Sequence, residues 1–283
     1  MPLVSMRDVL PKAKRDGYAV TAFNIENMEM AQTVVRTAAE LRSPVIVQTT
    51  PGTVKYAGLG MLRAMVAEEA GQADVPVVLH LDHGNSFELC ADAIRAGYTS
   101  VMIDGSKLPY EENAALTARV VKMAADAGVD VEGELGTVGG KEDAHEVKSG
   151  AEIYTDPRQA AEFRERTGVR SLAVAIGTSH GFYKGVPKLD FGRLREIAGL
   201  VGVPIVLHGA SGVPDEQVRR AVELGVCKVN FATELRAALT SGVREALRDE
   251  SVYDPKAFLR KGSERVAEVV RHKIAVCGCG GKA

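Results

Sequence analysis

Two hydrophobic patterns alternate along the chain. Short runs rich in β-branched residues recur eight times, and between them lie longer segments in which apolar residues return every three or four positions. The short runs, each expected to form a strand, cover residues 18–24, 44–48, 76–82, 100–104, 129–135, 171–177, 204–208 and 227–232. Strands that alternate with helices are typical of a parallel sheet covered on both faces.

The helical segments set the number of strand–helix units. They cover residues 28–42, 62–72, 87–97, 111–128, 156–168, 191–200 and 215–225, and two more, 234–247 and 255–274, follow the last strand. Eight such units predict an α/β fold, a (β/α)8 TIM barrel with extra C-terminal helices. An open, doubly wound sheet is the alternative on strand count alone. No linker rich in Pro, Ser or Gly divides the chain, so we expect a single domain, 1–283.

Composition narrows the class of protein. With 46% hydrophobic residues, 25% charged residues and a net charge of −2, the chain has no basic excess that would indicate nucleic acid. No apolar run approaches the roughly 20 residues of a membrane span, and the N-terminus lacks the apolar core of a signal peptide. We therefore expect a cytoplasmic protein with no membrane partner. The four cysteines form no disulfide framework, and Cys277 and Cys279 lack the second pair of a zinc ribbon.

Polar side chains gather where the predicted strands end. Catalytic groups of a (β/α)8 barrel lie at the C-terminal ends of its strands. The candidates at these positions are Asp82, His83, Asp104, Glu132, Glu134, His180, His208, Asn230 and Thr233. We expect them to converge on one rim.

Three histidines in this set, His83, His180 and His208, indicate a metal site. Three neutral imidazoles with one open position form the ligand set of a catalytic zinc centre. A single histidine there would more often only hydrogen-bond a loop, but three on one rim favour metal. The remaining histidines are expected in other settings: His80 in the core, His145 in a loop and His272 on a helix surface.

Two candidate phosphate-binding segments follow the later strands. Residues 208–212 (HGASG) and 230–233 (NFAT) have backbone N–H groups that can bind a phosphate at the usual position in a barrel. Glycines that serve only tight turns are the competing interpretation. The segment 136–143 (GTVGGKED) is predicted to be a mobile lid that brings in a proton-transfer carboxylate, Glu142. A solvated charged run is the alternative there.

The order of these motifs resembles a known family. AFN near residue 22, LHLDHG, VMIDGS, ELGTVGGKED, AIGTSHG, VLHGASG and KVNFATE follow the pattern of the metal-dependent class II ketose-bisphosphate aldolases along essentially the whole chain. GTSHG, VPDEQVRRAVELGV and NFATEL are most similar to the tagatose-bisphosphate branch. Fructose-bisphosphate enzymes more often have Asn or Asp where Ala232 stands.

The resemblance implies an activity and its partners. The expected reaction is reversible cleavage of tagatose or fructose 1,6-bisphosphate into dihydroxyacetone phosphate and glyceraldehyde 3-phosphate. The expected cofactor is one Zn²⁺ per subunit, and the resemblance also leaves room for a monovalent cation. A homodimer or homotetramer is expected, and a second, related subunit is a further possible partner.

The resemblance also implies residue roles. His83, His180 and His208 would hold the zinc, and Asp82 would be the acid/base residue. The chemistry of the reaction, rather than the resemblance, then assigns protonation of the enediolate to Glu142 of the predicted lid. Glu134 and Asp104 would lie beside the metal. The residues expected around the dihydroxyacetone phosphate half are Asn24, Gly181, Lys184, Gly209, Ala210, Ser211, Asn230, Phe231, Ala232 and Thr233.

Two departures from the family pattern concern the distal phosphate. A DPR motif near the last helices is common in the family, whereas this chain has DPK with Lys256, which keeps the charge but loses the guanidinium fork. The tail, often GSANR or GSA, is CGCGGKA here. The aldehyde half of the substrate therefore stays open at this point, including a different phosphorylated sugar or aldehyde.

Three other functions remain as alternatives. Lys228 on the last strand could act through a Schiff base, which would leave the three histidines without a task. A zinc hydrolase would use the same metal on phosphate esters. A non-catalytic sugar-phosphate-binding subunit that depends on a partner is the third, although the presence of Asp82 beside the histidines argues against a purely structural role.

Overall fold

Eight parallel strands form a closed barrel, which confirms the predicted (β/α)8 fold. The structure is a computed structural model and describes residues 3–142, 145–147, 154–183 and 185–283. Around the barrel the strands follow the order β1-β11-β10-β8-β5-β4-β3-β2. Their bounds are β1 (Val20–Asn24), β2 (Val45–Thr49), β3 (Val77–Gly84), β4 (Ser100–Ile103), β5 (Asp130–Leu135), β8 (Ser171–Val174), β10 (Ile205–Leu207) and β11 (Val226–Phe231).

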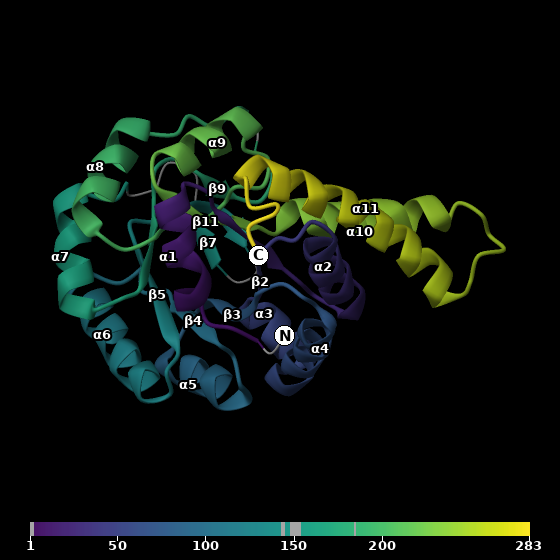
Figure 1. Ribbon diagram of the computed structural model, residues 1–283, viewed down its shortest axis with the longest axis horizontal. Helices are drawn as coiled ribbons and strands as arrows, with labels where there is room; N and C mark the ends of the chain where they lie inside the picture. The colour runs from purple at the N-terminus through teal and green to yellow at the C-terminus, as the bar shows by residue number, and fades with distance from the viewer. Residues whose placement is uncertain (1–2, 143–144, 148–153, 184) are drawn as a thin grey trace.

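Helices surround the barrel and cover the outer face of its strands (Figure 1). Their bounds are α1 (Met6–Asp16), α2 (Met28–Glu40), α3 (Pro51–Ala57), α4 (Leu59–Gln72), α5 (Phe87–Ala96), α6 (Tyr110–Asp126), α7 (Pro157–Thr167), α8 (Phe191–Val201), α9 (Asp215–Glu223), α10 (Thr233–Ala246) and α11 (Pro255–Cys277). Side-chain caps begin several of them, as where the Ser86 hydroxyl accepts a hydrogen bond from Leu89 N at 3.1 Å. Gly97 then ends α5 in the left-handed conformation.

Helix α1 lies across the N-terminal opening of the barrel (Figure 1). Its first turn is fixed to the start of β5, because the Arg7 guanidinium donates to Asp130 Oδ1 at 2.7 Å. The Ser5 hydroxyl donates to the other oxygen of Asp130 at 2.9 Å. These contacts close the end of the barrel opposite the predicted active site.

Helices α10 and α11 pair as an arm that projects away from the barrel (Figure 1). Glycines allow the two helices to approach closely: a Cβ on Gly242 would lie 2.4 Å from Lys261 O, and one on Gly262 would lie 2.8 Å from Leu239 Cδ1. Lys256, at the start of α11, is exposed and pairs with Asp254. In this chain Lys256 therefore lies on the arm.

Some elements were not predicted. Helices α1 and α3 are additional, and a small sheet with the order β7-β6-β9 lies outside the barrel. Its strands are β6 (Gly139–Glu142), β7 (His145–Val147) and β9 (Ser179–His180). Within the described ranges, no helix combines the length and the apolar character needed to cross a membrane.

Candidate active site

Three histidine rings meet at the C-terminal end of the barrel. His83 lies at the end of β3, His180 in β9 and His208 directly after β10. Each offers a ring nitrogen, and these three atoms lie within 4.8 Å of one another. The closest pair, His83 Nε2 and His208 Nδ1, is 3.1 Å apart. All three residues are buried. The geometry is therefore that of the predicted three-histidine metal site.

His83 reaches this position through an unusual backbone. Its φ is +50°, and among the described residues other than glycine only Arg42 shares a positive φ. Such a conformation is costly for a residue with a Cβ and is often found at functional sites. The pairing of β3 with β4 is also irregular between Leu81 and Gly84. A regular strand sends consecutive side chains to opposite faces, whereas this turn lets Asp82 and His83 both face the barrel mouth.

Asp104 fixes the orientation of the His83 ring. Its Oδ2 lies 2.9 Å from His83 Nδ1, so an ionised Asp104 accepts from Nδ1 and leaves Nε2 as the ligand atom. Burial would lower the pKa of His83, but the charges of Asp82, Asp104 and Glu134 outweigh it and hold that pKa well above its usual value. Without a metal, these acids thus favour the protonated ring.

Glu132 orients the ring of His208, as Asp104 orients the ring of His83. Its Oε1 accepts from His208 Nε2 at 2.8 Å, which directs Nδ1 toward His83. The other oxygen accepts from the buried ammonium of Lys228 at 2.9 Å. Burial and the neighbouring charge of His83 lower the pKa of His208 well below its usual value. The sequence indicates only that Glu132 lies at a strand end, because its partners His208 and Lys228 are 76 and 96 residues away.

Glu134 is a buried carboxylate beside the histidines. Neither of its oxygens has a hydrogen-bond partner among the described residues. Oε2 lies 3.5 Å from His208 Nδ1 and 3.9 Å from His83 Nδ1. Burial, the largest effect, raises the pKa of Glu134 well above its usual value. With His83 and Asp104 it forms a second set of atoms close enough to hold a metal ion.

Asp82 is held by two asparagines. Asn24 donates to Oδ2 at 2.8 Å and Asn230 donates to Oδ1 at 3.2 Å. Asn24 is itself oriented by Gln48, which donates to its Oδ1 at 2.8 Å. Burial would raise the pKa of Asp82, but positive charge on His83 and His208 and the hydrogen bond from Asn24 lower it. Asp82 is thus an oriented carboxylate next to a candidate ligand.

The two segments predicted to bind phosphate, 208–212 and 230–233, lie against each other. Ser211 Oγ accepts from Ala232 N at 3.2 Å and from Glu234 N at 3.4 Å, which joins the 208–212 loop to the start of α10. Gly209 has φ +62°, and a Cβ there would lie 2.8 Å from the Ser179 backbone. The structure therefore requires glycine at 209 and gathers the predicted phosphate-binding segments.

The other predicted substrate contacts differ in how exposed their side chains are. Gly181 and Thr233 line a cavity of about 660 Å³ beside α10. The side chain of Ala210 is buried, and the Phe231 ring packs against Phe23 with their centroids 5.8 Å apart. Phe231 can therefore offer a ligand only its backbone.

The predicted lid is partly described. Its residues 139–142 form β6, whose Gly140 lies opposite His180, and a Cβ at that glycine would lie 2.1 Å from His180 O. Glu142 ends β6, but its side chain lies outside the described residues, as does all of Lys184. The prediction that His145 lies in a loop is wrong, because the residue begins β7, which pairs with β6.

The remaining histidines agree with their predicted settings. His80 is buried, with Nδ1 3.0 Å from Ser100 Oγ and Nε2 3.8 Å from Glu132 Oε2. His272 lies on α11 with 52% of its side chain exposed and pairs with Asp215 at 2.9 Å. Neither belongs to the three-histidine group.

Comparison with known proteins agrees with this geometry. The profile of the family described as fructose-bisphosphate aldolase class-II matches residues 4–282. The chain belongs to the class II aldolases. It is therefore a carbon–carbon lyase of a family that is generally zinc-dependent.

Three proteins similar to this chain are aldolases, or a subunit of one, by name. A D-tagatose-1,6-bisphosphate aldolase subunit GatY from Klebsiella oxytoca is 47% identical over 100% of both chains. The YdjI aldolase of Escherichia coli K12 has a TM-score of 0.89 at 38% identity, with 99% of each chain covered. The fructose-bisphosphate aldolase of Campylobacter jejuni has a TM-score of 0.87 at 25% identity, over 100% of this chain and 97% of that one.

Two further side chains of this aldolase support the loop at 208–212 and were not predicted. The Tyr183 hydroxyl accepts from Ser179 N at 2.6 Å and donates to Gly209 O at 2.8 Å. Burial raises the pKa of Tyr183 to about 12. Lys273 on α11 is buried, and its ammonium lies 3.0 Å from Glu234 Oε2. The other oxygen of that carboxylate, Oε1, accepts a hydrogen bond from Gly212 N. GFYKG contained Tyr183, but its contact with Gly209 is not visible in the sequence.

Proposed function

We propose that this chain is a metal-dependent aldolase that reversibly cleaves a ketose 1,6-bisphosphate into dihydroxyacetone phosphate and glyceraldehyde 3-phosphate. The observation that carries the proposal is the convergence of His83, His180 and His208 beside an oriented Asp82. Tagatose 1,6-bisphosphate is favoured over fructose 1,6-bisphosphate by the full-length similarity to the tagatose enzyme subunit.

The residues present fit a zinc ion. His83 and His208 are each hydrogen-bonded to a carboxylate through one nitrogen and present the other toward the site, which is the usual arrangement of metal-bound histidines. Glu134, a buried carboxylate with no hydrogen bond among the described residues, is the group that a nearby cation would compensate. We propose His83, His180 and His208 as ligands. A bound zinc would supply a Lewis acid that stabilises negative charge on the substrate oxygen.

Asp82 carries out the proton transfer that accompanies bond cleavage. Its carboxylate takes the proton of the C4 hydroxyl, the electron pair of the broken O–H bond forms the second C4–O bond of the aldehyde, and the C3–C4 bonding electrons pass into the enediolate. In condensation Asp82 returns that proton to the aldehyde oxygen. Asn24 and Asn230 hold both carboxylate oxygens and so fix the direction of transfer.

A second carboxylate has to protonate the enediolate carbon, and we assign this step to Glu142. The support is the pairing of β6 with β9, which places the backbone of the segment against His180. Two proton transfers at different atoms thus involve two residues from different segments.

The segments 208–212 and 230–233 bind the phosphate of the dihydroxyacetone half. Ser211 accepts two backbone hydrogen bonds, so its own O–H can donate to phosphate. Gly181, Gly209, Ala210, Asn230, Phe231, Ala232 and Thr233 complete this surface with backbone and small side chains, and we include Asn24 and Lys184 as further contacts. Backbone N–H groups in such loops bind anions well.

The Schiff-base and binding-only alternatives are less well supported. Lys228 has no exposed surface and its nitrogen lies 2.9 Å from Glu132 Oε2, so it is held by a carboxylate rather than presented to a substrate. A binding subunit would have no use for Asp82 held beside three histidines. We retain a homodimer or homotetramer, with or without a second related subunit, as the assembly, and the cytoplasm as its compartment.

A coupled cleavage assay of the isolated chain tests the proposal. Both ketose bisphosphates are assayed before and after treatment with EDTA, and again after zinc is restored. The expected result is activity that the chelator removes and zinc restores, with a higher kcat/KM for tagatose 1,6-bisphosphate. Cleavage that survives chelation, and that borohydride traps on Lys228, would overturn it.

A further inference from the structure

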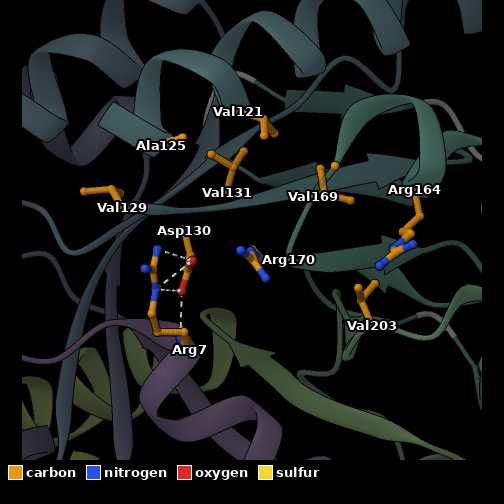
Figure 2. A pocket seen from close by; sticks show the side chains of 11 residues that line it. Arg7, Val121, Ala125, Val129, Asp130, Val131, Arg164, Val169, Arg170 and Val203 are labelled. Carbon is orange, nitrogen blue, oxygen red and sulfur yellow. Dashed lines mark hydrogen bonds and ion pairs between the residues drawn. The ribbon is translucent and has the colours of Figure 1, made fainter. Parts of the chain in front are cut away.

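A second cavity opens at the N-terminal end of the barrel, at the opposite end from the histidines. It has a volume of about 360 Å³ and is lined by residues from α1, the end of α6, β5, the end of α7 and the segments before β8 and β10. The volume lies within the range of small-ligand sites, roughly 300–1,000 Å³. Figure 2 shows Arg7 and Asp130 on one side of this cavity, Arg164 on the other and Arg170 between them.

The cavity has an apolar wall. Val131, Val169 and Val203 are 2%, 1% and 9% exposed, and their side chains form part of the lining. Such a wall excludes water from one side of a ligand and strengthens the polar contacts on the other. The shape and chemistry differ from those of a flat, solvated surface.

Positive charge dominates the polar side of the cavity. Arg7, Arg164 and Arg170 contribute three guanidinium groups, and Asp130 contributes one carboxylate. Asp130 pairs with Arg7, and no hydrogen bond or ion pair joins the side chain of Arg164 or Arg170 to any other residue that the structure describes. Arg166 lies on α7, as Arg164 does, but it differs from Arg164 and Arg170 because it pairs with both Glu111 and Glu162. Two guanidinium groups therefore remain available to a ligand.

We propose that this cavity binds a small phosphate-bearing anion at a site separate from the catalytic centre. Planar guanidinium groups match the geometry of phosphate and can each donate two parallel hydrogen bonds to it. Arg164 and Arg170 provide the main contacts, and Arg7 contributes through the edge that Asp130 leaves open. A dianion is preferred, because it neutralises the two unpaired charges.

Isothermal titration of the zinc-loaded protein with inorganic phosphate, at constant ionic strength, tests the proposal. The unmodified chain is compared with Arg164→Gln/Arg170→Gln and with a control, Arg166→Gln/Arg219→Gln, which removes the same charge away from the cavity. We expect the unmodified chain and the control to bind one phosphate that the cavity variant binds at least about tenfold more weakly. The kcat for sugar cleavage should be the same in all three proteins, because none of these arginines lies at the catalytic end.

The 208–212 loop at the catalytic end is also proposed to bind phosphate. Its contribution to the titration must therefore be separated from that of the cavity. Ser211→Ala in the same titration weakens only the phosphate bound at that loop. If the proposed aldolase function fails, the cavity variant still loses its phosphate while Ser211→Ala changes nothing. Identical isotherms for the unmodified chain and the cavity variant, or an equal loss in the control, would overturn the cavity proposal.

Discussion

Strands β3 and β10 have nearly the same sequence and end in different chemistry. The segments VPVVLHLDHG (75–84) and VPIVLHGASG (203–212) share their apolar body, and both strands are buried in the barrel. Each also has a left-handed residue near its end, which is His83 itself in β3 but Gly209, after the histidine, in β10.

The position of the left-handed residue, at His83 itself in β3 but one residue after His208 in β10, decides what each strand brings to the site. In β3 the turn at His83 brings Asp82 and His83 together at the barrel mouth. In β10 the turn follows His208 and leads into the loop that contains Ser211. The apolar body fixes only the position of a strand. The residue that takes the positive φ determines whether two polar side chains reach the barrel mouth or a loop such as 208–212 follows.

The largest expected effect comes from replacing His83 in β3 or His208 directly after β10. His83→Ala and His208→Ala each remove one of three ligands, so zinc content should fall from about one ion per chain to near zero. Activity should fall to that of the chelated protein. Metal analysis and the cleavage assay check this, with the surface variant His272→Ala as the control. Full zinc content in either variant would contradict the ligand assignment.

The next effect distinguishes the two residues of β3. Asp82→Asn removes the proton acceptor but no ligand, so kcat should fall about 10²- to 10⁴-fold while zinc content is retained. Asp126→Asn, an exposed residue on α6, is the matched control. Steady-state kinetics with metal analysis measure both quantities. Near-normal kcat in Asp82→Asn would remove its acid/base role.

A smaller effect is expected from Glu132, which orients His208 directly after β10. Glu132→Gln weakens the contact that orients His208, so zinc affinity should fall about 10- to 100-fold in a competition titration. The variant also leaves the buried Lys228 ammonium without its carboxylate, which should lower the free energy of unfolding by about 3 kcal/mol.

Adding Lys228→Met to Glu132→Gln separates these two consequences. The double variant should recover most of the lost stability in thermal unfolding, because no buried charge remains unpaired. Zinc affinity should stay low, since the glutamate is still missing. Recovery of zinc affinity in the double variant would show that Glu132 acts on the fold rather than on His208.

The smallest effect belongs to the loop after β10. Ser211→Ala removes one donor to phosphate and the acceptor for two backbone N–H groups, so KM should rise about tenfold while kcat changes little. Thr178→Ala, in the segment after β8, is the control. An unchanged KM would place the phosphate elsewhere.

The sequence predicted the parts of the molecule that follow from periodicity and position. All eight barrel strands lie within about two residues of their predicted bounds at most of their ends, because an apolar run fixes a strand wherever it occurs. The convergence of the three histidines followed from the rule that strand ends share a rim. The prediction of a metal site came from the residue type, because three histidines form a common zinc ligand set.

The unpredicted parts depend on contacts between distant residues. Arg7 and Asp130 are separated by 123 positions, and Glu132 and Lys228 by 96, with no local pattern to mark either pair. The positive φ of His83 has no signal either, because glycine is the usual residue there and it stands one position later in the sequence. The pairing of β6 with β9, about 40 residues away, is likewise not marked by any local pattern.

The most direct test of the account measures two reactions in zinc-loaded Asp82→Asn. One is cleavage of the ketose bisphosphate, and the other is exchange of the dihydroxyacetone phosphate C3 proton with deuterated water, which does not involve the C4 hydroxyl. If β3 supplies a ligand and a separate proton shuttle, cleavage is lost and exchange continues at close to its normal rate. Loss of both reactions with zinc still bound would contradict that division of tasks.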